Sequence, residues 1–322
     1  MRSLGSHRAA AIALGLGIGA IVASILVWTL GSAREEARRA PELGTRIVGL
    51  HRLDDEIGYV LRPGSKVRHH VKQFDVEYRV DEDGSRHVPG SERGRPRVLV
   101  FGDSWTFGHG VTDDETYAAR LQEHWPDVAV RNFGTMGYGT AHTLLLLERL
   151  LAASEGDVDL VLYGWTPIHL GRSYLRASNL AVTASKRAPR LEIENGRLVS
   201  KGLADQSEAI ADGTPGLARA EWSRTMAAIR RMAKLADEKG ARFVLVTLPG
   251  PEDDRVFPAH SERLRKRLGP LGVEVIDLDA APDVSKDLDL FIPNDAHPNA
   301  RWNAMVADAI AARLDPSPIS RW

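Results

Sequence analysis

Short apolar runs alternate with amphipathic stretches over the last two thirds of the chain. Runs typical of buried strands occupy 98–101, 128–130, 160–163, 243–248 and 273–278. Stretches with apolar residues at helical spacing lie between or after them, at 114–125, 141–153, 217–239, 256–268 and 299–314. Five buried strands that alternate with helices predict an α/β fold with a parallel sheet between two helical layers. The carboxyl ends of the strands then meet at one edge of the sheet, where α/β proteins place their sites.

Residues 171–216 interrupt this alternation after the third predicted strand. Apolar residues flank Asn195-Gly196 on both sides, and Asn-Gly between apolar runs is typical of a tight hairpin turn. We therefore predict an insertion that contains a β-hairpin and covers the active edge of the sheet as a lid. A plain surface excursion is the alternative.

Residues 34–95 are predicted to form a charged linker and a strand-rich lead segment. Within the lead, a period of two predicts a half-buried strand, whose apolar members are Phe74, Val76, Tyr78 and Val80. His69 and His70 are adjacent, so on a strand they point to opposite faces and cannot bind one metal together. We predict that both lie at the surface. Two interpretations of the lead stay open, namely packing at the sheet edge and extension of the site towards a polymer.

The first 33 residues contain an uncharged stretch of 22 residues at 9–30. As a helix it is about 33 Å long, enough for a hydrocarbon core of about 30 Å. Trp28 lies near one end, where interfacial aromatics are found. We predict a single-pass membrane anchor with an extracytoplasmic catalytic domain, although basic residues on both sides leave the orientation open. A cleaved signal peptide ending at Gly31-Ser32-Ala33 is the alternative.

The amino-acid composition excludes several kinds of site and gives no support for a nucleic-acid partner. The 322 residues include no cysteine, which excludes disulfides, thiolate metal sites, iron–sulfur clusters and a thiol nucleophile. Lysine and arginine number 42 against 43 acids, so there is no basic excess to favour a nucleic-acid partner. We also predict no metal and no cofactor: Asp113-Asp114-Glu115 is typical of a helix start, and the glycines in 134–139 lack the order of a nucleotide loop.

The remaining candidates for chemistry are a serine and a histidine at opposite ends of the α/β region. Ser104 follows the first predicted strand, and His297 precedes the last predicted helix, two residues after Asp295. A serine hydroxyl becomes a good nucleophile when an imidazole removes its proton, and a carboxylate fixes the tautomer of that imidazole. The predicted topology brings both segments to the same edge of the sheet.

Three segments resemble the SGNH/GDSL hydrolase family. Gly-Asp-Ser-x-Thr-x-Gly at 102–108 matches its nucleophile block, and 132–139 and 295–299 look like its second and final blocks. The resemblance implies a flavodoxin-like three-layer sandwich over 96–316. It also implies Ser104 as nucleophile, His297 as general base and Asp295 as its orienting carboxylate. The backbone N–H groups of Ser104 and Gly137 would bind the oxyanion.

The chain departs from the family pattern at two positions. Ile168 stands where the third block usually carries an asparagine that donates to the oxyanion, so Thr166 and His169 are the nearby replacement donors, of which we choose Thr166. Many members also place the carboxylate three residues before the histidine, where this chain has Asn294. The two-residue spacing of Asp295 resembles that of SGNH proteins similar to alginate O-acetyltransferases.

These features lead to one main functional hypothesis and two alternatives. The main hypothesis is a membrane-anchored serine esterase or deacylase, whose substrate is an acylated small molecule or O-acetyl groups of an envelope or extracellular polysaccharide. An O-acyltransferase would use the same residues with a sugar hydroxyl as acceptor. A non-catalytic carbohydrate-binding or assembly protein on an SGNH scaffold is the third hypothesis, prompted by Ile168. The acyl group, the acceptor and the oligomeric state are left open.

Overall fold

The computed structural model describes residues 47–91, 97–153, 158–172, 175–180, 183, 185–211, 214–254 and 256–316. The predicted membrane segment at 9–30 lies outside these residues. Among the residues described, no helix is long and apolar enough to cross a membrane. The anchor and the signal peptide therefore stay predictions.

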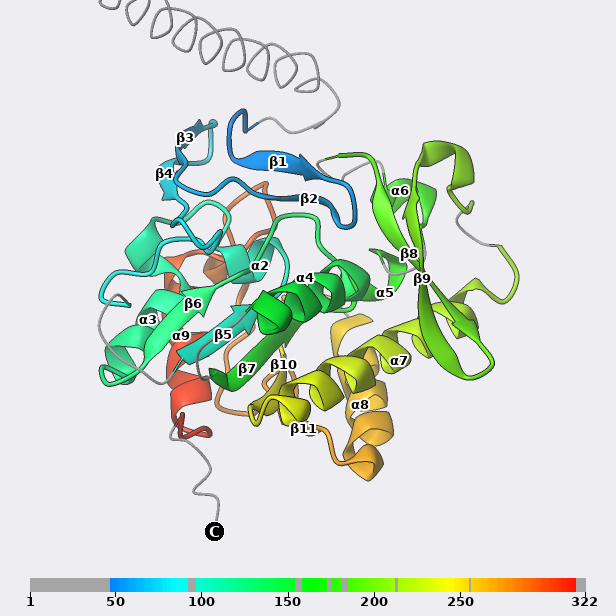
Figure 1. The fold of residues 1–322 in the computed structure, drawn as a ribbon. Helices are drawn as coiled ribbons and strands as arrows, with labels where there is room; N and C mark the ends of the chain where they lie inside the picture. The colour runs from blue at the N-terminus through cyan, green and yellow to red at the C-terminus, as the bar shows by residue number, and fades with distance from the viewer. Residues whose placement is uncertain are drawn as a thin grey trace, which may run out of the picture. The chain divides into compact units, whose positions relative to one another are not determined.

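The centre of the fold is a five-stranded parallel sheet (Figure 1). Its strands are β5 (Arg97–Phe101), β6 (Ala129–Asn132), β7 (Val158–Trp165), β10 (Arg242–Thr247) and β11 (Glu274–Asp277). They lie in the order β11-β10-β7-β5-β6, so numbering them along the chain gives 2-1-3-4-5, the flavodoxin-like order. The order reverses between β5 and β7, and ligands of such sheets bind outside the carboxyl ends of the strands at that point.

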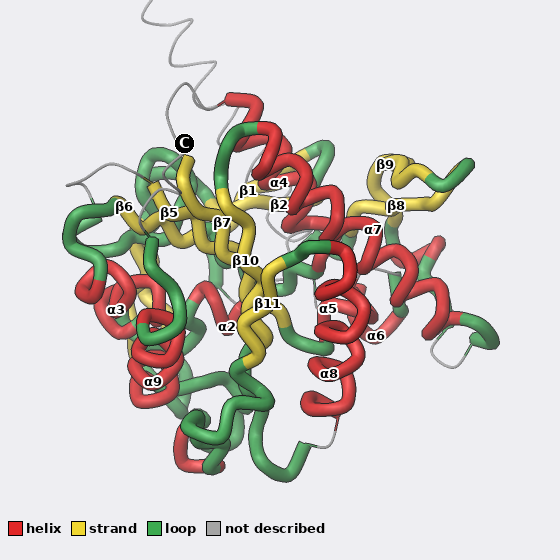
Figure 2. The backbone as a smooth tube through the Cα atoms, turned by 90° about the horizontal axis from the view of Figure 1, so that it is seen from below, coloured by secondary structure: helices red, strands yellow, loops and turns green. Residues whose placement is uncertain are grey.

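Helices cover both faces of the sheet, as Figure 2 shows. On one face lie α3 (Tyr117–His124) and α9 (Ala300–Ala311), and on the other α4 (Thr140–Ala153), α7 (Leu217–Glu238) and α8 (Val256–Leu268). Right-handed crossovers dictate this distribution once the strand order is given. The prediction of an α/β fold with a parallel sheet is confirmed. The expected helix at 114–125 begins only at α3, because Asp113–Glu115 forms a separate 3-10 turn closed by a Thr112–Glu115 capping box.

The lead segment forms two antiparallel hairpins, and the strand predicted from its alternation is one of their four strands. They are β1 (His51–Asp54) with β2 (Gly58–Leu61) and β3 (Lys66–His70) with β4 (Asp75–Arg79). Val76 and Tyr78 of β4 are buried, as the period of two predicts. After β4, the Arg86 N–H donates to the Asn132 carbonyl at 2.8 Å, so the lead packs against the edge strand β6.

The surface prediction for the two lead histidines is wrong for one of them. His69 and His70 do point to opposite faces of β3, and His70 is exposed, but His69 is only 7% exposed. The reason is tertiary: β3 and β4 lie over the loop that follows the predicted nucleophile, and the rings of His69 and His109 are 5.3 Å apart between centroids.

The helix α5 (Ile168–Arg172) leads into the insertion, which contains α6 (Ala177–Leu180), β8 (Ala188–Glu194) and β9 (Arg197–Ala204). Asn195 and Gly196 form the turn of the β8–β9 hairpin with φ angles of 49° and 75°, as expected of a turn that needs two positive φ values. Both strands contact α7, and β8 also contacts α4. The hairpin therefore packs on the helical layer, whereas the start of the insertion reaches the site described below.

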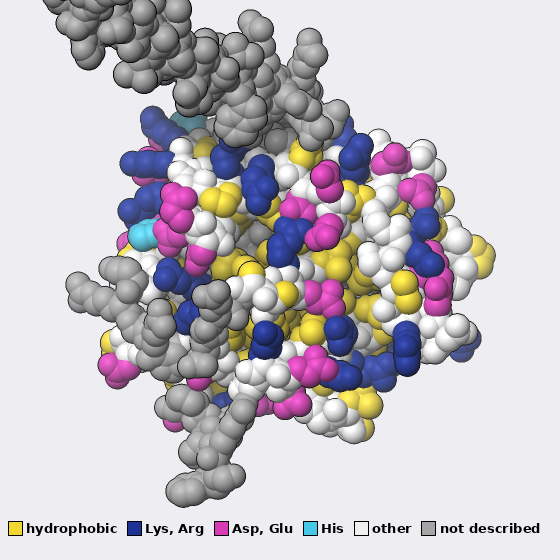
Figure 3. All heavy atoms as spheres, viewed as in Figure 1, with side chains coloured by type: hydrophobic (Ala, Val, Ile, Leu, Met, Phe, Trp, Pro, Cys, Tyr) yellow, Lys and Arg dark blue, Asp and Glu magenta, His cyan; other side chains and the backbone are white. Residues whose placement is uncertain are grey.

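Charged side chains of both signs are interspersed on the face shown in Figure 3, in keeping with the net charge of −1. Inside the protein, charges occur in pairs. Arg86 is fully buried; its Nε donates to Asp113 at 3.1 Å and its Nη2 to the Val111 carbonyl at 2.7 Å. Its Nη1 donates to the carbonyls of Phe107 and, at 2.5 Å, Gly108. A buried guanidinium is tolerated when its donors are satisfied in this way.

Two buried histidines join the lead to α4. The rings of His51 and His142 both pack edge-on against Tyr59, with centroids 5.4 and 5.8 Å away. Burial lowers the pKa of His51 to about 4 and that of His142 to about 3. Both rings are therefore neutral at pH 7.

Because His51 and His142 are buried in the neutral form, we predict that the free energy of unfolding falls in mild acid. The unfolded chain takes up protons on histidine near pH 6.5, whereas the folded rings stay neutral, so the free energy of unfolding falls as the pH drops below that value. From pH 7 to pH 5 each ring accounts for about 2 kcal/mol of this loss. In urea titrations, His142→Phe should lose about 2 kcal/mol less than wild type over this range. His70→Gln, at an exposed position, should behave as wild type, and equal losses in wild type and His142→Phe would contradict the prediction.

Candidate active site

Ser104 begins a short helix at the carboxyl end of β5. This helix, α2 (Ser104–Phe107), is capped by Asp103, whose Oδ1 accepts from the Trp105 N–H at 3.0 Å. Gly102 makes the turn into the helix, where a Cβ would lie 2.0 Å from Thr106 Oγ1 and 2.9 Å from the Gly164 carbonyl. No larger residue fits there, which explains the glycine of the nucleophile block. The result is a serine at the point where the strand order reverses.

Asp103 also joins the nucleophile helix to the start of the insertion. Its Oδ2 lies 3.0 Å from Arg172 Nη1 and 3.2 Å from His169 Nε2, all three side chains being buried. Burial alone would raise the pKa of Asp103, but His169 and Arg172 hold it below its ordinary value. The other ring nitrogen of His169 contacts the Tyr163 hydroxyl at 2.9 Å. His169 thus faces a buried carboxylate, which disfavours it as the replacement oxyanion donor.

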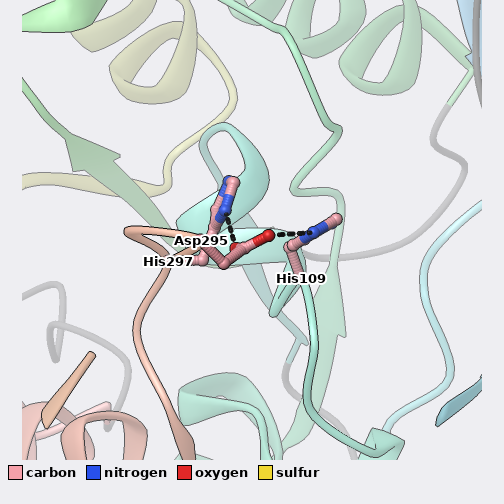
Figure 4. A group of neighbouring side chains, drawn as sticks. All are labelled: His109, Asp295 and His297. Carbon is pink, nitrogen blue, oxygen red and sulfur yellow. Dashed lines mark hydrogen bonds and ion pairs between the residues drawn. The ribbon is translucent and has the colours of Figure 1, made fainter. Parts of the chain in front are cut away.

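Asp295 and His297 occupy a tight loop before α9. The Ile292 N–H donates to the His297 carbonyl at 2.8 Å, and the Asp295 N–H donates back to the Ile292 carbonyl at 3.1 Å. Asn294 and Ala296, on either side of Asp295, have left-handed φ angles of 60° and 67°. This conformation is costly for alanine. It brings Asp295 Oδ1 to 2.6 Å from His297 Nδ1, the contact drawn in Figure 4.

The other ring nitrogen of His297 completes a chain of hydrogen bonds. His297 Nε2 lies 2.9 Å from Ser104 Oγ, although the two residues are 193 positions apart in sequence. The hydrogen bond from His297 holds the pKa of Asp295 below its ordinary value, so the carboxylate is ionised at neutral pH. A neutral imidazole in this position can take the serine proton, and the carboxylate stabilises the imidazolium that forms.

A cleft of about 710 Å³ opens beside this chain of hydrogen bonds. Ser104, Asp295 and His297 line it together with Trp105 and with residues of α5, α7 and α8. One wall is aromatic, because the rings of Trp105 and Phe257 stack with centroids 5.5 Å apart. From the insertion, the cleft lining includes Gly171, Arg172 and Arg176, and it includes no residue of β8 or β9.

The predicted oxyanion donors differ in their surroundings. Thr166 lines the cleft, is 1% exposed, and its Oγ1 has no hydrogen-bond partner among the residues described. Ile168 also lines the cleft but is 45% exposed and offers no side-chain donor. Gly137 lies in the loop after β6 with a φ of 80°, and its part in binding an oxyanion stays a prediction. Thr166 thus brings a buried hydroxyl without a partner among the described residues to the cleft, and its part in binding an oxyanion also stays a prediction.

His109 was not expected at the site. Its Nε2 lies 3.7 Å from Asp295 Oδ2, the contact drawn on the other side of the carboxylate in Figure 4. His109, Asp295 and His297 offer ligand atoms within 4.8 Å of one another, the metal-like grouping found among the described residues. A cation there would have to replace the 2.6 Å bond between Asp295 and His297.

Comparison with known proteins finds similar structures but no similar sequence. No family model and no curated protein matches the chain. Esterase EstA from Pseudoalteromonas sp. aligns with a TM-score of 0.43 and 14% identity, over 68% of this chain and 96% of its own. A member of the lipolytic protein G-D-S-L family from Veillonella parvula DSM 2008 gives 0.41 and 14%, over 67% and 96%. The structure named TesA gives 0.45 and 17%, over 69% and 99%.

From the hydrogen bonds that link Ser104, His297 and Asp295, we predict that Asp295 controls the reactivity of Ser104. Asp295→Asn keeps the shape but no longer selects the imidazole tautomer that accepts the serine proton, so labelling of Ser104 by a fluorophosphonate should slow by roughly 10²–10⁴. Asp289→Asn, at an exposed carboxylate near the same loop, is the matched control and should label at the wild-type rate. Equal labelling of the two variants would show that Asp295 does not orient His297.

Proposed function

We propose that this protein is a membrane-anchored serine esterase or deacylase of the SGNH type. The observation that carries the proposal is the continuous set of hydrogen bonds Ser104–His297–Asp295 at the carboxyl edge of a flavodoxin-like sheet. The agreement of the 102–108 and 295–299 segments with SGNH motifs supports it. So does the aromatic cleft, because it opens directly on the serine.

The geometry supports a two-step acyl transfer. Ser104 Oγ attacks the ester carbonyl while His297 Nε2 takes its proton, and the carbonyl oxygen becomes an oxyanion. The Ser104 and Gly137 N–H groups and the Thr166 hydroxyl are the proposed donors to this oxyanion. His297 then protonates the leaving alcohol, which departs and leaves an acyl-enzyme. Water, deprotonated by His297, releases the acid and regenerates the serine.

We propose O-acetylated polysaccharide of the cell envelope or exterior as the substrate. A cleft of about 710 Å³ exceeds what an acetyl group needs and has room for part of the alcohol to which it is attached. Aromatic walls such as Trp105 and Phe257 suit the apolar faces of sugars as well as short acyl chains. The predicted anchor at 9–30 would hold the domain near such polymers.

An acyl-release assay tests the proposal. Purified protein is incubated with acetylated polysaccharide and with p-nitrophenyl acetate, and acetate and nitrophenol are measured for wild type and Ser104→Ala. We expect release that Ser104→Ala abolishes. Full release by Ser104→Ala, or no release and no fluorophosphonate labelling by wild type, would refute a serine esterase. Acetyl transfer to an added oligosaccharide faster than release to water would instead identify an O-acyltransferase.

Thr166 provides a second prediction, specific to oxyanion binding. Thr166→Val keeps the volume and removes the hydroxyl, so kcat should fall by about 10² while KM changes little. Thr166→Ser keeps the hydroxyl and should stay within a few-fold of wild type. Wild-type turnover in Thr166→Val would mean that backbone N–H groups bind the oxyanion without this side chain.

A further inference from the structure

His109 contacts both members of the Asp295–His297 pair. Its Nε2 faces the carboxylate oxygen that His297 does not use, at 3.7 Å. Its ring lies against the ring of His297, with centroids 4.2 Å apart and a tilt of 39°. Figure 4 shows the carboxylate between the two imidazoles. A distance of 3.7 Å is longer than a hydrogen bond, so this contact is an electrostatic one across a short gap.

The surroundings of His109 select its protonation state. Burial and the neighbouring His297 lower the pKa of His109 to about 3, so the ring is neutral and carries one N–H. Its Nδ1 is buried with no hydrogen-bond partner among the residues described. A proton on Nδ1 would be unsatisfied and would turn the lone pair of Nε2 towards the carboxylate. The favoured tautomer therefore carries the proton on Nε2, facing Asp295.

The lead segment holds His109 in this place. The Gly110 N–H donates to the Tyr78 hydroxyl at 2.9 Å, and the Phe74 ring packs edge-on against His109 at 5.1 Å. Arg86 donates to the carbonyls of Phe107, Gly108 and Val111. Donors and rings from the lead thus contact the loop 107–111 on both sides of His109.

Gly110 shows how tightly the loop is enclosed. Its φ is 82°, and a Cβ there would lie 2.4 Å from Ile292 Cδ1 and 3.1 Å from the Phe74 ring. Ile292 belongs to the loop that carries Asp295 and His297. The lead, the loop 107–111 and the Asp295–His297 loop are therefore in direct contact, with His109 between them.

We propose that His109 is a positioning residue for the Asp295–His297 pair and that the lead segment forms part of the active site by holding it there. The inference rests on the proposed function, because it concerns the base of that reaction. A neutral ring leaves His297 as the group that takes the serine proton. The N–H dipole of His109 fixes the plane of the Asp295 carboxylate, and the face of the His109 ring limits rotation of His297.

The proposal predicts a change in the pH profile. The titratable or charged groups that face His109 are His297, Asp295, His69 and Arg86. The His109 N–H dipole offsets part of the negative charge of Asp295. When a substitution removes this N–H, Asp295 attracts a protonated His297 more strongly. The acid limb of kcat/KM should therefore move to higher pH, whereas a loss of packing alone would lower turnover without moving that limb.

Two substitutions separate these effects. His109→Phe keeps a ring against His297 and removes the donor, so kcat on p-nitrophenyl acetate should fall about tenfold with KM unchanged and the acid limb raised by about half a pH unit. His109→Gln restores an N–H donor and should recover most of kcat and the wild-type limb. His70→Gln is the matched control, because His70 is the exposed histidine next to His69 on β3; this variant should keep wild-type kinetics.

A measurement on the unmodified protein covers the case in which the variants do not fold. Histidine ¹⁵N NMR of the wild type should show His109 neutral, with the proton on Nε2, from pH 8 to pH 5. Protonation of His109 near pH 6.5 would overturn the proposal. So would wild-type kinetics in His109→Phe, or equal losses in both His109 variants with no shift of the acid limb. If Ser104→Ala keeps full activity, the proposed function itself fails; if only the His109 results fail, it stands.

Discussion

The burial of the Arg86 guanidinium is the constraint on which the arrangement of the site depends. A charge in the interior costs several kcal/mol unless its donors are satisfied. Here the loop 107–111 turns three carbonyls inward to accept them, and Asp113 supplies the opposite charge. The same contacts end the nucleophile helix and set the path of His109. Because Arg86 also pairs through its backbone with Asn132 on β6, the lead is joined to the sheet as well as to the loop.

A second buried charge fixes the other end of the nucleophile helix. Asp103 caps α2 and is neutralised by Arg172, which comes from α5 at the start of the insertion. The helix that begins with Ser104 thus lies between an anionic centre at its N-terminus and a cationic centre at its C-terminus. In each centre the arginine comes from outside the core α/β units: Arg86 from the lead, and Arg172 from the start of the insertion. The four-residue helix could not hold its orientation through its own hydrogen bonds, since so short a helix is unstable alone.

Much of the molecule was predictable from local pattern. The apolar runs marked all five strands of the sheet, because strands covered on both faces must be continuously apolar. The helix predicted at 256–268 from its apolar spacing coincides with α8. Ser104, His297 and Asp295 were found because the chemistry demands these residue types and the topology returns them to one edge. His69 was misplaced and His109 overlooked, since no period or spacing shows that β3 and the loop 107–111, far apart in the sequence, cover each other in the fold. His169 looked like a donor until its pairing with Asp103 was visible.

The sequence by itself determined the five strands of the sheet, the long helices that cover it and the absence of thiol chemistry, and it pointed to the proposed nucleophile and base. The elements follow from side-chain periodicity and the exclusion of thiols from composition, both of which are properties of single residues and their neighbours, whereas the roles of nucleophile and base are what the resemblance implies. Only the tertiary structure decided the strand order, the 2.9 Å contact between Ser104 and His297, and the place of the lead against the loop 107–111. The strand order depends on how distant βα units pack, and the two contacts depend on which distant groups satisfy a buried charge or donor; both exist only once the chain has folded.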